Sequence, residues 1–77
     1  MSLAELIKQT RLRASLSPQE FATQLHVGLS TVHHWENGRA IPSTRSMCSI
    51  RLFCKRKRLP FKHLVDEWLK ARYDGKK

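Results

Sequence analysis

The chain has 77 residues and a formal net charge of +9, because 15 Lys and Arg residues stand against 6 Asp and Glu residues. This length allows one small domain with a thin core and leaves little room for a deep catalytic cleft. No apolar run approaches the roughly 18 residues of a membrane span, and residues 1–5 lack the pattern of a secretory signal. We therefore expect a soluble, cytoplasmic protein with no membrane partner.

The first two predicted elements are short helices that begin with capping residues. Apolar residues recur at helical spacing along the chain, and strand alternation is absent. A first helix is predicted over about 3–14, behind a capping box that starts at Ser2. A second is predicted over 18–25 behind Ser17, with Pro18 at the first helical position, where its missing N–H costs nothing.

A third helix is predicted directly after a tight turn at residues 26–28. It spans 29–36, with Gly28 as its N-cap, and ends at Asn37-Gly38, where glycine can adopt the left-handed conformation. A fourth helix opens at Ser43 or Thr44.

The last part of the chain is predicted to contain one more helix. Leu59-Pro60 interrupts the fourth helix, a final helix covers 61–73, and residues 74–77 form a frayed tail. The spacing turns one face of each helix toward a common core. The predicted core residues are Leu3, Leu6, Ile7, Ala14, Phe21, Ala22, Leu25, Val27, Val32, Trp35, Met47, Ile50, Phe53, Cys54, Phe61, Leu64, Val65, Trp68 and Tyr73.

Two short helices joined by a three-residue turn are typical of the helix-turn-helix unit, whose second helix lies in the DNA major groove. The stretches 16–22, 25–27 and 31–38, with Pro42-Ser43 after them, resemble the Cro/cI-type (XRE family, lambda-repressor-like) helix-turn-helix. The resemblance covers about residues 3–54, and its most specific part is Trp35-Glu36-Asn37-Gly38 followed by Pro42-Ser43.

The resemblance implies a fold for the whole chain. We expect an all-α, five-helix lambda-repressor-like DNA-binding domain over residues 1–77, with the helix-turn-helix at about 18–37. An extended basic fourth helix or linker and a C-terminal amphipathic helix complete it. The resemblance also implies an ion pair between Arg11 and Glu36, which would hold the end of the third helix at its angle to DNA.

The resemblance further implies which residues contact double-stranded DNA. The base-reading positions fall on Leu29, Ser30 and His34. The Leu29 side chain can contact a thymine methyl group, and the Ser30 hydroxyl can bond to either kind of base pair. The His34 imidazole can donate to a guanine acceptor. Contacts to the DNA backbone are expected from Gln19, Thr31, His33, Asn37, Arg39, Ser43, Thr44 and Arg45. The competing interpretation of the two histidines is that they are simply exposed to water.

The sequence departs from the family pattern at several positions. Pro18 stands where the family often has a glutamine that contacts phosphate, so this contact is lost or passes to Gln19. Ser15 and His26 replace glycines, at a cost on the order of 1 kcal/mol each if the left-handed conformation is kept. Arg51 occupies a position that usually holds a small core residue, so either the fourth helix is rotated or the side chain extends to water.

The positive charge is concentrated late in the chain, where residues 43–77 hold eleven basic and three acidic residues. Such a balance favours a polyanionic partner, although it also keeps a small protein soluble. The run Lys55, Arg56, Lys57, Arg58 would add non-specific affinity for nucleic acid. Because about 15 Å of helix separates it from the DNA-facing end, an acidic protein partner or a second DNA segment explains it better. A nuclear-import signal is a third interpretation.

Cys48 and Cys54 lie six residues apart, which on one helix is about 9 Å along the axis and too far for a disulfide. We expect both to be reduced thiols that pack as small apolar residues. The spacing does not fit a zinc finger or ribbon, and the sequence predicts no metal and no cofactor. The chain offers no nucleophile–base pair, and His33-His34 lack a partner at ligand spacing, so we expect no catalytic residues and no enzyme.

The sequence therefore leaves two functions open. The first is a sequence-specific, nucleoid-associated transcriptional regulator that binds double-stranded DNA as a homodimer. The alternative is an adaptor or antitoxin-like module that binds a protein partner through residues 55–73, with DNA contact secondary.

Overall fold

A computed structural model describes residues 2–74, and within this range the chain forms five α-helices and no strand. The helices are α1 (Leu3–Arg13), α2 (Pro18–Leu25), α3 (Leu29–Glu36), α4 (Thr44–Lys57) and α5 (Lys62–Asp74). The boundaries agree with the predicted ones to within one residue, and the expected all-α fold is confirmed. Asp74 is the last residue of α5, and residues 75–77 of the expected tail lie outside the described residues. Within the same range no helix combines the length and the apolar character needed to cross a bilayer.

Within residues 2–74, three residues other than glycine adopt the left-handed conformation, and each lies just beyond the end of a helix. Ser15 and His26 have φ angles of 58° and 59°, so the left-handed turns usual for glycine are kept with larger residues. Arg58 ends α4 in the same way, with a φ angle of 57°. Each position carries a backbone cost of about 1–2 kcal/mol because its Cβ approaches the following carbonyl.

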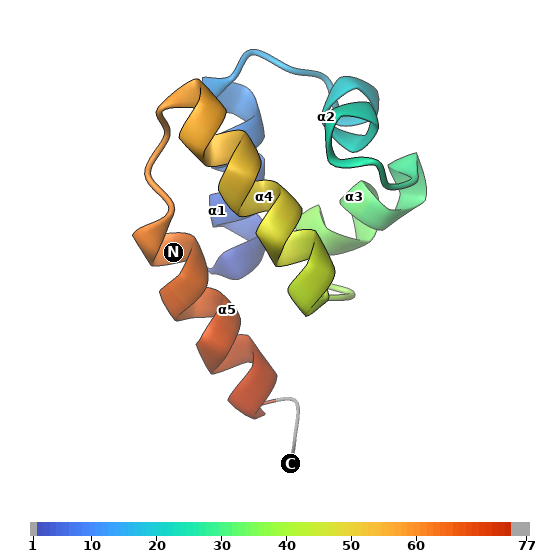
Figure 1. Ribbon diagram of the computed structural model, residues 1–77. Helices are drawn as coiled ribbons and strands as arrows, with labels where there is room; N and C mark the ends of the chain where they lie inside the picture. The colour runs from blue at the N-terminus through green and yellow to red at the C-terminus, as the bar shows by residue number, and fades with distance from the viewer. Residues whose placement is uncertain (1, 75–77) are drawn as a thin grey trace.

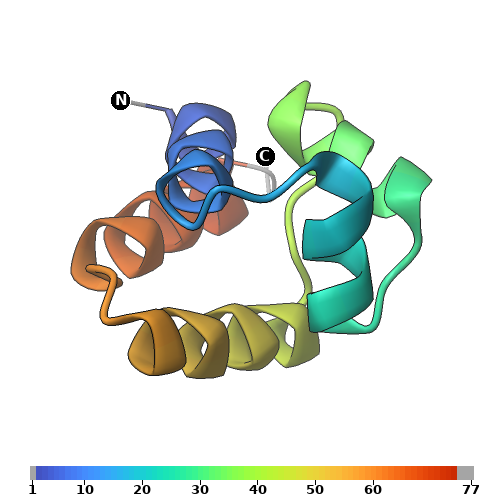
Figure 2. The ribbon, with the colours of Figure 1, turned by 90° about the horizontal axis from the view of Figure 1, so that it is seen from above.

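The helices form two pairs joined by α4. Helix α2 packs on α3, and α1 packs on α5. Figures 1 and 2 show these pairs on opposite sides of the molecule, with α4 running from one pair to the other. Contacts between α1 and α3 and between α2 and α4 close the arrangement. As a result, α3 is held by its neighbours along one face only.

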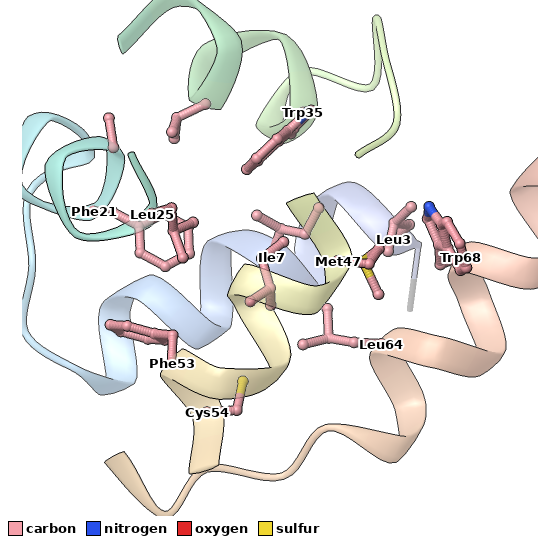
Figure 3. Packing of buried hydrophobic residues seen from close by; sticks show 13 residues of the cluster. Leu3, Ile7, Phe21, Leu25, Trp35, Met47, Phe53, Cys54, Leu64 and Trp68 are labelled. Atoms are coloured by element: carbon pink, nitrogen blue, oxygen red, sulfur yellow. The ribbon is translucent and has the colours of Figure 1, made fainter. Parts of the chain in front are cut away.

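The core contains side chains from all five helices, gathered where the two pairs meet (Figure 3). The rings of Phe21 and Phe53 meet edge to face within it, with centroids 5.3 Å apart. Leu3, Met47 and Trp68 gather at the end of the core nearest α5.

The structure contradicts the predicted burial of two side chains, Tyr73 and Cys48. Tyr73 is 76% exposed, because α5 extends past the body of the molecule there. Cys54 is buried as expected, but Cys48 is exposed, because the two residues lie on different faces of α4. Of the two expectations for Arg51, extension to water holds, since its side chain is exposed while the predicted inner face of α4 stays buried.

Candidate nucleic-acid interface

Helix α2 begins with a complete capping box. The Ser17 hydroxyl accepts a hydrogen bond from the Glu20 N–H at 3.1 Å, and the Glu20 carboxylate accepts one from the Ser17 N–H at 2.8 Å. The hydrogen bond from the Ser17 backbone lowers the pKa of the Glu20 carboxyl. With Pro18 at the first helical position, local interactions specify where α2 begins.

The turn between α2 and α3 is closed by backbone hydrogen bonds around His26. The N–H of His26 donates to the Thr23 carbonyl at 3.2 Å, and the N–H of Val27 donates to the Ala22 carbonyl at 3.0 Å. Ala22 is fully buried, so α2 and α3 approach closely at this point. Gly28 is the N-cap of α3 and makes no side-chain cap.

Helix α3 is amphipathic, with one face in the core and the opposite face exposed. Val32 and Trp35 are buried, whereas Ser30, His33 and His34 are exposed. Ser30 and His34 are i,i+4 neighbours, and their side chains therefore share one surface patch. At the edges of this patch, the predicted base-reading residue Leu29 is 36% exposed and the predicted backbone contact Thr31 is half-buried.

The segment after α3 leads directly to the start of α4. Asn37 caps the C-terminus of α3, and Gly38 follows with a φ angle of 73°. Arg39 is exposed in the connecting loop. These residues therefore lie beside the exposed face of α3 and not in the core.

Two predicted contacts to the DNA backbone have side chains that are already engaged within the protein. The Ser43 hydroxyl caps α4 by accepting from the Ser46 N–H at 3.2 Å. The Gln19 side-chain amide donates to the Thr23 hydroxyl at 3.3 Å. Thr44 and Arg45, in the first turn of α4, are exposed. The first turn of α4 therefore offers a hydroxyl, a guanidinium and helix N–H groups on one surface.

An ion pair joins α1 to the end of α3. Arg11 Nε and Nη2 donate to the two carboxylate oxygens of Glu36 at 2.8 and 3.0 Å, and both side chains are 9% exposed. The hydrogen bond to Glu36 is the main reason why the pKa of Arg11 is raised. Arg11 Nη1 also donates to the Leu16 carbonyl at 2.9 Å. One guanidinium therefore holds the end of α3 and the residue two positions before α2.

Sequence reasoning missed a second long-range contact near the interface. The indole N–H of Trp68 in α5 donates to the carbonyl of Pro42, the residue directly before the cap of α4, at 2.6 Å. The sequence identified Trp68 only as an apolar core residue. A buried tryptophan usually finds a hydrogen-bond partner, but no pattern along the chain indicates which carbonyl this partner is.

The fold and this surface define a class of protein: an all-α DNA-binding domain built on a helix-turn-helix, with α2 and α3 as its two helices. A family model described as "Helix-turn-helix domain" matches residues 2–56, and the chain belongs to this family. The match is consistent with the resemblance to XRE and Cro-like domains, and it indicates a DNA-binding regulator in general. No curated protein gives a significant match, and no solved structure does. The matched range ends in the last turn of α4, so α5 lies outside it.

Proposed function

We propose that this protein is a sequence-specific transcriptional regulator that binds double-stranded DNA with α3 in the major groove. The observation that carries the proposal is the two-sided character of α3. Its exposed face presents Ser30 and His34 one turn apart, while Val32 and Trp35 anchor the opposite face in the core. A hydroxyl and an imidazole at this spacing can form hydrogen bonds to neighbouring base edges.

The base-reading residues in this proposal are Leu29, Ser30 and His34. Ser30 donates to or accepts from either kind of base pair, and His34 donates to a guanine acceptor. The partly exposed Leu29 side chain contacts a thymine methyl group. Together they would read a short half-site.

The contacts to the DNA backbone hold α3 in register without reading sequence. The exposed cations Arg39 and Arg45 would make the charged contacts. Because the side chains of Ser43 and Gln19 are engaged within the protein, phosphate would be bound by the free helix N–H groups at the start of α4 and by the Gln19 N–H at the start of α2. The remaining proposed backbone contacts are Thr31, His33, Asn37 and Thr44.

A single small module buries only about 600–1,000 Å² of its surface on DNA, so two copies are needed for tight binding. We propose that two copies occupy half-sites separated by one turn of DNA, about 34–36 Å. The selected DNA site would then be palindromic.

Selection of binding sites from random duplex DNA tests this proposal. We expect a palindromic motif, and we expect His34→Ala to relax the base preference at one position of each half-site. His63→Ala is the matched control, because His63 is also exposed but lies on α5. Equal binding to all sequences at about 150 mM salt, where non-specific electrostatic binding is weakened, would contradict sequence-specific recognition.

A further inference from the structure

An apolar groove lies between α4 and α5. Its floor is formed by Met47, Phe61, Val65 and Trp68, and it encloses about 150 Å³. Thr44, Cys48 and Arg51 line its α4 side. We call this surface the α4–α5 groove; Figure 2 shows the two helices that border it, and Figure 3 shows Met47 and Trp68 at the edge of the core.

The groove continues toward the start of α4. Thr44 and Trp68 also line a second cavity of about 370 Å³, which reaches Ile41 and Arg72. Ile41 is 41% exposed, and Leu69, one turn after Val65, is 43% exposed. Exposed apolar side chains therefore flank the groove, whose floor combines the buried Met47 and Trp68 with the half-buried Phe61 and Val65.

The rims of the groove are basic. Arg51 lines the α4 side, and the exposed Lys55 follows one turn later on the same helix face. On the α5 side, the guanidinium carbon of Arg72 lies 4.7 Å from the centre of the Trp68 ring. Among residues with described side chains, no carboxylate lines either cavity. An apolar floor between cationic rims is complementary to a helix that is apolar on one face and acidic on its flanks.

We propose that the α4–α5 groove is the docking site for an acidic amphipathic helix of a partner protein. On α4 the lining residues Thr44 to Arg51 span about 10 Å, and Lys55 lies one turn beyond them, so the groove and its basic rim match roughly 12 helical residues. Apolar side chains of the partner cover Phe61 and Val65, and its carboxylates pair with Arg51, Lys55 and Arg72. This is the helix-in-groove mode of recognition.

The charges favour this occupant over the two others that could fill the groove. A second copy would bring its own basic rims against these, within a pair of chains that each carry +9. A DNA segment would satisfy the cations, but its phosphates and sugars would leave the apolar floor without a partner. Only a ligand that is both acidic and apolar is complementary to both features.

Protection of Cys48 provides a direct test on the unmodified 77-residue chain. Cys48 is exposed in the groove and Cys54 is buried, so a thiol reagent reports on the groove alone. The probe is a synthetic helical peptide of about 15 residues with leucine along one face and glutamate on both flanks. One control peptide replaces leucine by glutamine, and the other replaces glutamate by lysine. We expect the probe to slow alkylation of Cys48 and to bind about tenfold more tightly than either control.

Two charge reversals on α4 distinguish docking of the probe peptide in the groove from its general electrostatic attraction to a basic protein. Arg51→Glu removes a rim charge, whereas Arg56→Glu makes the same change in net charge about 140° around the helix. Both side chains are exposed, and thermal unfolding checks that both variants fold. We expect Arg51→Glu to weaken the probe about tenfold and Arg56→Glu to weaken it less than about threefold.

Several outcomes would overturn the proposal. Equal effects of the two reversals, or equal binding of the glutamine control peptide, would show that attraction of a polyanion is the whole effect. Protection of Cys48 by a short DNA duplex alone would assign the groove to nucleic acid. Protection that rises with protein concentration, together with dimers in sedimentation, would assign the groove to a second copy. None of these experiments depends on DNA recognition by α3.

Discussion

The indole N–H of Trp68 donates a 2.6 Å hydrogen bond to the carbonyl oxygen of Pro42, two residues that lie 26 positions apart in the chain. Both residues are buried. The bond ties α5 to the residue before Ser43, the cap of α4, and so to one edge of the proposed DNA surface. Helix α5 lies outside the range of the family match, but it supports a part of the interface that lies inside this range.

Substitution of Trp68 by Phe should destabilise the protein. The change leaves the buried Pro42 carbonyl without a partner, at a cost of about 1–3 kcal/mol in the free energy of unfolding. For a domain of this size each 1 kcal/mol lowers Tm by roughly 4–8 °C. Tyr73→Phe is the control, because the Tyr73 side chain is exposed at the end of the same helix. A Trp68→Phe variant as stable as the parent in urea unfolding would show that the bond contributes nothing.

Removing both partners of the ion pair should cost less than the sum of the two single removals. Arg11→Met leaves the nearly buried Glu36 carboxylate unpaired, and we expect a loss of about 3 kcal/mol. In the double variant Arg11→Met/Glu36→Leu no charge is stranded, so its loss should be smaller than the sum of the two single losses by about 1 kcal/mol or more. Some loss remains because the Leu16 carbonyl also loses Arg11 as a donor. Additive losses in a double-mutant cycle would refute this coupling.

In the left-handed turns, introducing glycine should raise the free energy of unfolding and replacing glycine should lower it. His26→Gly should raise the free energy of unfolding by about 0.5–1 kcal/mol, because the release of left-handed strain exceeds the entropic cost of glycine. Gly38→Ala should lower it by about 1–2 kcal/mol. A Cβ at Gly38 would meet no atom within 4 Å, so this loss comes from the backbone alone.

Gly28→Ala is the matched control for these turns. The φ angle of Gly28 is −77°, and a Cβ there would lie 3.9 Å from the Thr31 hydroxyl oxygen. We expect a loss below about 1 kcal/mol, smaller than at Gly38, because this φ angle suits alanine and only its poorer N-cap preference counts against it. If both alanine variants lost the same stability, backbone conformation would not be the cause.

Loss of a charge that contacts phosphate should reduce the salt dependence of DNA affinity, whereas loss of the same charge elsewhere should not. Arg45→Ala should weaken binding to all DNA sequences alike and lower the slope of log affinity against log salt by about 0.9. Arg56→Ala removes the same charge at the other end of α4 and should leave the slope nearly unchanged. Fluorescence anisotropy at several salt concentrations measures both slopes. An equal change in the two variants would indicate that Arg45 makes no specific phosphate contact.

The two cysteines should react differently with a thiol reagent. Native protein should take up one adduct, at Cys48, and denatured protein two, as counted by mass spectrometry. Burial raises the pKa of the Cys54 thiol to about 11, so little thiolate forms there in the folded state. The Cys48→Ser variant should take up no adduct until it unfolds.

The same thiol predicts a loss of stability at alkaline pH. In the unfolded chain Cys54 ionises near pH 8.5, well below its pKa in the folded state. Its contribution to stability is therefore complete below about pH 8.5 and declines as the pH rises toward 11. Cys54→Ala should remove this part of the decline. Identical pH profiles for the two proteins would contradict the raised pKa.

The sequence by itself determined the helices, their ends and the inward faces of α1 to α4. Ser17 and Glu20 show why, since their hydrogen bonds join residues three positions apart. Interactions between residues so close in the chain depend on local spacing, and this spacing is visible as a pattern in the sequence. The two-sided character of α3 follows from the same periodicity, since Ser30 and His34 lie one turn apart.

Only the tertiary structure decided how distant elements meet. The Trp68 indole could donate to any carbonyl within reach, and its partner depends on where α5 crosses the loop before α4. The exposure of Cys48, in contrast to the buried Cys54, likewise depends on which part of α4 is left uncovered. The α4–α5 groove likewise depends on how two helices that are connected in sequence come to border one apolar surface. Helical periodicity specifies which side of each helix is apolar, whereas the distance between two helices is set by packing against the rest of the core.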